Sequence, residues 1–438
     1  MECKTDQTRA YVCMLLVTNA CNLNCVYCYE SHKSNKCMTL EVAQKAIQNA
    51  FDKEGFDYVS IQFMGGEPLL AFSLMKEISE WMWKNEFPKP YELFAATNGT
   101  LLNNEMKVWF SENKERISLG LSFDGIPLAQ DMNRSQSSRQ IDFGFFRKTW
   151  PNMYVKMTVS VDTIPYLRDS VVFLEESGFQ NIKADLAYMR GWQTKHLRIW
   201  DEELKKLVAY YADGEHDNHC SLLDTKIEAV FAKNVSAKRC GCGKDIVCVD
   251  TDGKEYPCQM YAPISMSKQL FNTVKDIDFS DEKNFEIPEC QQCILHSCCP
   301  ACSGCNLKYN GAINKLDSFY CKAFVIQFMR TLDYRYKIAN KIVDETVRND
   351  TLHDLNEIAN VITIKQEYTM NKIIDNIINS ILGSSSISPV VVKLARPQSQ
   401  LSLHRELQHY AASSDGCGGY TGHCSCTNNP CMICSNAH

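Results

Sequence analysis

The chain has 438 residues, of which 45% are hydrophobic and 22% charged. This is ordinary globular composition, and the length allows two or three domains, so disorder throughout is excluded. The net charge of -6 provides no basic surface for nucleic acid. No apolar run approaches the roughly 20 residues that span a bilayer, and the N-terminus lacks the apolar core of a signal peptide. We therefore expect a cytoplasmic protein with neither nucleic acid nor a membrane as partner.

Cysteine is the outlier of this composition, with 23 residues. Disulfides rarely persist in a reducing compartment, so clustered cysteines there more often bind metal or take part in chemistry. The positions of the cysteines therefore carry much of the functional argument.

Strand-like and helix-like runs alternate over the first half of the chain. One strand per roughly 30 residues is the spacing of βα units, which predicts a parallel sheet with helices outside it. The expected strands are Tyr58–Met64, Tyr91–Thr97, Ile117–Phe123, Val155–Val161 and Asn181–Leu186, and the expected helices are Leu40–Phe51, Phe72–Trp83, Asn103–Ser111 and Tyr166–Ser177.

Polar or glycine-rich segments follow four of these strands, at residues 65–68, 97–100, 122–125 and 160–162. In parallel βα folds ligands bind at the carboxyl ends of the strands, so these segments should line one face. Before them, residues 21–28 read C-N-L-N-C-V-Y-C. Three thiolates cannot all pair as disulfides, and as metal ligands they leave a fourth coordination position open.

This cysteine motif, followed in order by F-M-G-G-E-P, T-N-G-T and L-S-F-D-G, resembles the signature of the radical S-adenosylmethionine (radical SAM) enzymes. The resemblance implies an α/β fold with a partial (β/α)6 TIM-like barrel, expected over residues 1–215. It also implies that Cys21, Cys25 and Cys28 are the catalytic ligands of a [4Fe-4S] cluster. The fourth iron would bind the amino and carboxylate groups of S-adenosyl-L-methionine.

The same resemblance suggests which residues contact that cofactor. Tyr27 would pack near the adenine, and Gly65 and Gly66 would let the backbone approach the methionyl end. Glu67 would accept a hydrogen bond from the ammonium group. By position in the pattern, the ribose and methionyl polar groups would be contacted by Asn98, Ser122, Asp124 and Ser160, although each of these is equally explained as a loop residue that caps a helix.

A second field of cysteines occupies the expected domain at 216–330 and resembles the SPASM domain, a small unit that holds two auxiliary [4Fe-4S] clusters. The chain matches its C-x2-C-x5-C segment, but the next cysteine follows after two residues instead of three, and Cys298 and Cys305 are spare. By matching, one cluster would be held by Cys290, Cys293, Cys299 and Cys321, and the other by Cys240, Cys258 and Cys302 with Cys242, for which Cys248 competes. A zinc site is the alternative.

Relatives with SPASM domains act on peptides or proteins, which sets the expected substrate class. In sulfatase maturases an aspartate base directly follows the Gly-x4-Cys cysteine, whereas this chain has Gln259, so sulfatase maturation is disfavoured. Another group installs thioether or related crosslinks in cysteine-rich ribosomal peptides. Auxiliary clusters suit this reaction because they can bind a substrate thiolate or accept an electron.

The last part of the chain bears on the substrate. We expect a helical extension over residues 331–382, in which Tyr368–Leu382 has the apolar period of an amphipathic helix. Residues 383–438 read as a linker and a tail with five cysteines, which resembles a precursor peptide fused to its maturase. A metal site or a disordered reducing tail are the alternatives. About ten residues precede the barrel, so we expect no N-terminal peptide-recognition domain, and tethering would compensate by raising the effective substrate concentration.

The sequence therefore predicts a radical SAM oxidoreductase, a peptide maturase that crosslinks a cysteine-rich peptide and receives electrons from a partner such as flavodoxin or ferredoxin. Two alternatives stay open. One is a radical SAM oxidase or epimerase that acts on another substrate, and the other is a non-catalytic iron–sulfur electron-transfer protein.

Overall fold

The computed structural model describes residues 9–214, 219–232, 236–238, 240–291 and 293–366. The expected amphipathic helix at Tyr368–Leu382 and the cysteine-rich tail lie outside these residues.

One sheet organises the described part of the chain, with the strand order β7-β6-β5-β4-β3-β2-β1-β8-β9. All neighbouring strands are parallel except β8 and β9. This sheet confirms the expected parallel α/β, TIM-like fold. The strands are β1 (Ala10–Thr18), β2 (Tyr58–Gly65), β3 (Tyr91–Thr97), β4 (Ile117–Ser122), β5 (Val155–Val159), β6 (Asn181–Leu186), β7 (His219–Cys220), β8 (Ile246–Val249) and β9 (Glu255–Tyr256).

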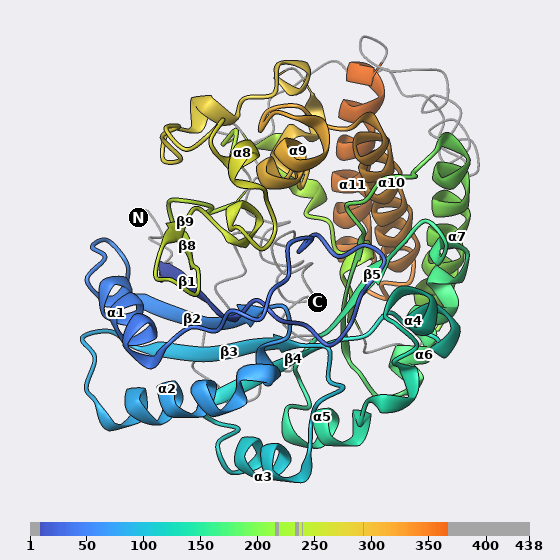
Figure 1. The fold of residues 1–438 in the computed structure, drawn as a ribbon. Coiled ribbons are helices and arrows are strands. Elements are labelled where there is room, and N and C mark those ends of the chain that lie inside the picture. The colour runs from blue at the N-terminus through green and yellow to red at the C-terminus, as the bar shows by residue number, and fades with distance from the viewer. Residues whose placement is uncertain (1–8, 215–218, 233–235, 239, 292, 367–438) are drawn as a thin grey trace.

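Helices cover the sheet, and Figure 1 shows α1, α2 and α3 along its outer side and α8 and α9 on the opposite side. Two of the helices, α1 and α3, begin at polar caps, since Thr39 Oγ1 accepts from the backbone of Val42 and Asn103 Oδ1 from that of Met106. The helices are α1 (Leu40–Phe51), α2 (Phe72–Lys84), α3 (Asn104–Glu112), α4 (Pro127–Asn133), α5 (Phe143–Thr149), α6 (Leu167–Glu176), α7 (Thr194–Asp213), α8 (Lys268–Phe271), α9 (Ser303–Asn310), α10 (Ser318–Ala339) and α11 (Glu345–Gln366).

Strand β1 lies between the two halves of the fold and is buried on both faces. Cys13 and Leu15 point into the core under the outer helices. Met14 and Leu16 point the other way, into a second core that contains many of the cysteine-rich segment's side chains. Burial on both faces explains why β1 is a continuous apolar run without alternation. This strand was not among the expected ones, although its sequence is strongly apolar.

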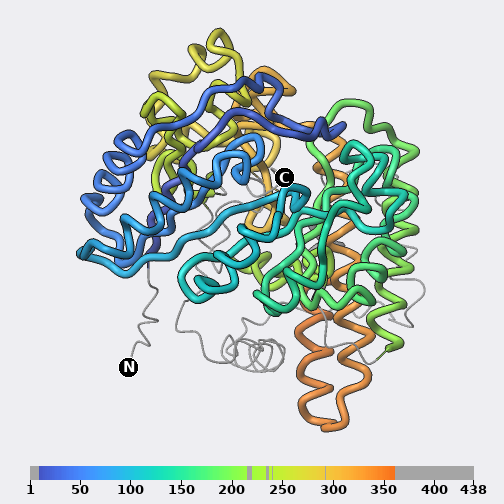
Figure 2. The backbone as a smooth tube through the Cα atoms, turned by 60° about the horizontal axis from the view of Figure 1, so that its bottom comes forward, coloured from blue at the N-terminus to red at the C-terminus, as the bar shows by residue number. Residues whose placement is uncertain are grey.

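The sheet does not stop at residue 215, where the barrel was expected to end. Strand β8 pairs in parallel with β1 and continues antiparallel into β9, so the cysteine-rich segment extends the same sheet. Figure 2 shows α10 and α11 as a pair of helices that projects past the barrel next to α7. They share a third core with Ile227, Val230 and Leu295. No helix among the described residues is long and apolar enough to cross a membrane.

Candidate functional site

The three cysteines of the motif lie on one loop that follows β1. Each of Cys21, Cys25 and Cys28 is partly exposed. The loop closes on itself, since the backbone of Cys28 donates to Cys25 O at 3.1 Å and that of Leu23 donates to Cys21 Sγ at 3.4 Å. We call residues 19–36 the thiol loop, because Asn19 N and Lys36 O are hydrogen-bonded at its base.

Burial raises the pKa of all three thiols, to about 12 for Cys28. Two cations oppose this effect, Lys33 at all three thiols and Arg134 at Cys25. The Lys33 ammonium donates to Leu23 O at 2.9 Å, inside the thiol loop. Thiols with raised pKa values stay protonated at neutral pH unless a metal displaces the proton, which couples metal binding to proton release.

Two glycines fit the end of β2 against the base of the thiol loop. A Cβ on Gly65, whose φ is +143°, would lie 2.1 Å from Thr18 O, and one on Gly66 would lie 2.2 Å from Ala20 O. The backbones of Gly66 and Glu67 donate to these same two carbonyls. Glycine is therefore required here by contact with the protein itself, and the predicted approach of a cofactor to this backbone remains a prediction.

Glu67 is fully buried and is already held by the protein. Its Oε1 accepts from Thr97 Oγ1 at 2.7 Å and from the Leu69 backbone at 3.1 Å, and its Oε2 accepts from the Asn98 backbone at 2.8 Å. Burial raises the pKa of Glu67 to about 7 against the effect of these hydrogen bonds. The carboxylate joins the ends of β2 and β3, so its predicted contact with an ammonium group would add to these partners.

Asn98 links β3 to the thiol loop. Its Nδ2 donates to Asn22 Oδ1 at 2.9 Å, and Asn22 Nδ2 donates to Thr100 Oγ1 at 2.8 Å. Ser160 instead caps a turn, because its Oγ accepts from the Thr163 backbone at 3.3 Å. The structure thus places Asn98 in contact with the thiol loop, whereas Ser160 caps the turn that follows its own strand.

A buried ion pair lies behind the thiol loop. Asp124 Oδ2 is 3.1 Å from Arg134 Nε, and neither side chain is exposed to solvent. Tyr27 OH donates to the same Oδ2 at 2.6 Å, and the Thr158 backbone donates to Oδ1 at 2.9 Å. The sequence predicted Tyr27 and Asp124 but missed Arg134, which follows α4, a helix that was not expected.

Several buried polar atoms near the strand ends have no hydrogen-bond partner among the described residues. They include Nη1 and Nη2 of Arg134, Oδ1 of Asn133, Oγ1 of Thr158 and both carboxylate oxygens of Glu30. Buried polar groups are nearly always satisfied, so such a set indicates a polar ligand or water between them. Three partly exposed thiols beside unpartnered donors and acceptors fit an iron–sulfur cluster and a cofactor with a polar amino-acid end.

Two further groups of thiols lie in the cysteine-rich segment. The outer thiol group, Cys290, Cys293, Cys299 and Cys321, lines a small cavity together with Ile287 and Phe324. We define the inner thiol group as Cys242, Cys258, Cys302 and Cys305, which lie together in the second core. Cys248 is fully buried on β8. No three His, Cys, Asp or Glu side chains of the described residues are arranged to hold a single metal ion.

Polar contacts join the thiol loop to the cysteine-rich segment. Lys308, on α9, donates from Nζ to Ser31 Oγ at 3.0 Å and to Tyr29 O. The His32 backbone donates to Ile264 O at 2.9 Å. The thiol loop and the inner thiol group are thus held against one another.

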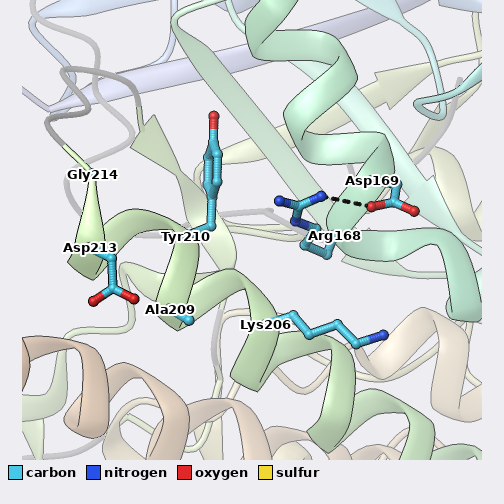
Figure 3. A pocket seen from close by; sticks show the side chains of 7 residues that line it. All are labelled: Arg168, Asp169, Lys206, Ala209, Tyr210, Asp213 and Gly214. Atoms are coloured by element: carbon cyan, nitrogen blue, oxygen red, sulfur yellow. Dashed lines mark hydrogen bonds and ion pairs between the residues drawn. The ribbon is translucent and has the colours of Figure 1, made fainter.

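A separate hollow of about 530 Å³ lies between α6 and α7. Figure 3 shows Arg168, Lys206 and Tyr210 around it, with Arg168 paired to Asp169. None of its lining residues is a cysteine, and it lies on the outer helical layer, so it is not part of this site.

Comparison with known proteins agrees with this geometry. The family model described as the Radical SAM superfamily matches residues 15–141. The uncharacterized protein MJ0907 of Methanocaldococcus jannaschii is 30% identical over 44% of this chain and 69% of its own length. A cysteine-type anaerobic sulfatase-maturating enzyme of Clostridium perfringens is 25% identical over 74% of this chain and 97% of its own. The solved structure of native anSMEcpe with bound AdoMet and Kp18Cys peptide has a TM-score of 0.60 at 20% identity, and the match covers 76% of this chain and all of that one.

Proposed function

Since this chain belongs to the radical SAM superfamily, whose enzymes use [4Fe-4S] clusters and S-adenosylmethionine, we propose that it is a peptide maturase. The reaction proposed is the formation of thioether or related crosslinks in a cysteine-rich peptide. The candidate substrate is the chain's own tail, whose cysteines are Cys417, Cys424, Cys426, Cys431 and Cys434.

Cys21, Cys25 and Cys28 would hold the radical-forming cluster. When bound, the cluster and S-adenosylmethionine supply the 5′-deoxyadenosyl radical that removes a substrate hydrogen. The chain's contribution is to fix and enclose this site. Glu67 joins the ends of β2 and β3, and the buried Arg134 presents unpartnered donors suited to a carboxylate.

The peptide substrate class is supported by two similarities. A relative matched over nearly its whole length is a sulfatase-maturating enzyme, and a structure of similar fold was solved with a bound peptide. Sulfatase maturation itself is disfavoured here, because the position of the expected base holds Gln259, which is fully buried and carries no charge. The inner and outer thiol groups would hold auxiliary clusters, which supply an acceptor for the electron released when a substrate radical closes onto sulfur.

The test uses full-length protein reconstituted without oxygen and reduced with dithionite in place of flavodoxin or ferredoxin. After addition of S-adenosylmethionine, 5′-deoxyadenosine is quantified, and the masses of the digested tail peptides are measured by mass spectrometry. We expect the 417–434 peptide to lose two hydrogens per crosslink, with matching deoxyadenosine, and neither change in Cys21→Ala. Deoxyadenosine with an unchanged tail would contradict the fused-substrate proposal and favour a substrate in trans. No deoxyadenosine at all would contradict the maturase proposal.

A further inference from the structure

We infer that the inner auxiliary cluster is held by Cys242, Cys258, Cys302 and Cys305, with Cys305 in the place that sequence matching gives to Cys240. This assignment rests on the proposed function only in that it supposes an auxiliary cluster at the inner thiol group. It replaces one ligand of the set and keeps the number of thiolates at four.

The first turn of α9 provides two of the four thiols. Cys302 is the N-cap of this helix, and its Sγ accepts from the Cys305 backbone at 3.4 Å. Each of these two residues is only 3% exposed. Unpaired backbone N–H groups at a helix start favour negative charge, so this turn suits two thiolates.

Close packing brings this turn to Cys258. A Cβ on Gly304 would lie 2.6 Å from the Cβ of Met260, so only glycine allows α9 to approach the segment that follows Cys258. A hydrogen bond of 2.9 Å between Tyr261 OH and Ser303 Oγ fixes the same contact. Cys305 and Cys258 consequently lie in the same buried core.

Cys242 completes the set from a third segment. It lies in the same buried core as Cys258, and the residue is 1% exposed. The next residue, Gly243, has a φ of +69° and donates to Pro257 O at 2.8 Å, which ties the turn to the residue before Cys258. The buried ammonium of Lys238 donates to Cys242 O and holds this turn from the other side.

Cys240 lies at the margin of the group. It is partly exposed and packs against the second core from outside. Cys305, by contrast, is in the second core together with Cys242, Cys258 and Cys302.

Four protein thiolates would complete the coordination of the inner cluster. A fully ligated cluster has no open iron for a substrate thiolate, so we assign it electron transfer and not substrate binding. The sequence alone left both roles open.

The test compares Cys305→Ala with the matched variant Cys240→Ala in the full-length protein. Each is reconstituted without oxygen, and iron, sulfide and the electron paramagnetic resonance (EPR) spectrum are measured. We expect Cys305→Ala to lose about four iron ions per chain relative to the unchanged protein, while Cys240→Ala keeps its full iron content. Normal iron in Cys305→Ala, or the loss of iron in Cys240→Ala instead, would overturn the assignment.

Two further measurements keep the result interpretable. If Cys305→Ala does not fold, Cys305→Ser replaces it, and a changed EPR signal of one cluster is expected because oxygen would replace sulfur as the ligand. An unchanged signal would contradict the assignment. Deoxyadenosine formation depends on the thiol loop, so its absence in the unchanged protein would count against the proposed function, whereas a normal cluster count in Cys305→Ala would count only against this inference.

Discussion

The thiol loop and the inner thiol group use the same side chain in opposite surroundings. The three thiols of the loop are partly exposed and come from one short run of sequence. The inner group draws Cys242, Cys258, Cys302 and Cys305 from three distant segments and buries each to 3% exposure or less. An open loop with three thiols suits a site that must admit an exchangeable ligand, whereas an enclosed set of four suits a site that must not.

The thiol loop and the inner thiol group also differ in the interactions that hold them in place. Backbone and polar side chains from β2 and β3 hold the thiol loop. Burial in the second core holds the inner group, with Met260 and Tyr261 packed against the start of α9 and hydrogen bonds from Tyr261 and Lys238 beside them. Changes that damage one support and spare the other should therefore separate the two sites.

The largest expected effect comes from Gly66→Ala. The new Cβ would lie 2.2 Å from Ala20 O and 2.9 Å from the Cβ of Cys21, so the thiol loop must shift. A displacement of about 1 Å at a reacting site can cost about 100-fold in rate, and we expect at least that loss in deoxyadenosine formation, with the iron of the other two thiol groups retained.

The control for this change is Gly311→Ala, at a φ of +82° with no atom within 4 Å of the added Cβ. It imposes backbone strain of about 1 kcal/mol without a clash. Full activity in Gly66→Ala, or equal losses in the two variants, would show that the loop contact is not what matters.

An effect on stability instead of activity is expected from Asp124→Asn. The change leaves the buried Arg134 without its anionic partner, and breaking a buried pair costs about 3–5 kcal/mol. Asp245→Asn is the matched control, because its partner Arg9 is 49% exposed and such pairs contribute about 0–1 kcal/mol. The free energies of unfolding in urea should differ accordingly, and equal values would refute the importance of the buried pair.

The smallest effect is expected from a change at a helix cap, outside the thiol loop and the inner thiol group. Asp142 caps α5 by accepting from the Phe145 backbone at 3.1 Å, and the hydrogen bond from Lys107 is the main cause that holds the pKa of Asp142 below its ordinary value. Asp142→Ala should cost about 1 kcal/mol at pH 7.

The pH dependence of this cap has a definite sign. A pKa lowered by folding stabilises the fold above the unfolded value and loses that contribution as the pH falls through the folded one. The free energy of unfolding in urea should therefore differ less between Asp142→Ala and the unchanged protein as the pH is lowered from 5 towards 3. A difference that does not change with pH would show that the carboxylate charge is not involved.

The sequence predicted much of the barrel because its elements are local. Helix α1 and strands β3 and β6 have the expected ends, since caps and apolar periods lie within each element. Strand β1 was missed because burial on both faces removes the alternation that marks a strand. The pairing of β8 with β1 joins residues far apart in the chain, which no local pattern encodes.

The residues of the candidate site also divide into those that a local pattern predicts and those that depend on contacts between distant parts of the chain. Tyr27 and Asp124 were predicted separately, but their hydrogen bond and the presence of Arg134 depend on α4 packing behind the loop. Gly304 was not singled out, because its contact with Met260 exists only in the folded chain. Spacing alone therefore could not decide between Cys240 and Cys305.

The most direct test of the account is deoxyadenosine formation by Cys25→Ala and Cys258→Ala, each reconstituted without oxygen and supplied with dithionite and S-adenosylmethionine. We predict no deoxyadenosine from Cys25→Ala, and deoxyadenosine without crosslinked peptide from Cys258→Ala. Deoxyadenosine at the level of the unchanged protein from Cys25→Ala would contradict the assignment of radical formation to the thiol loop.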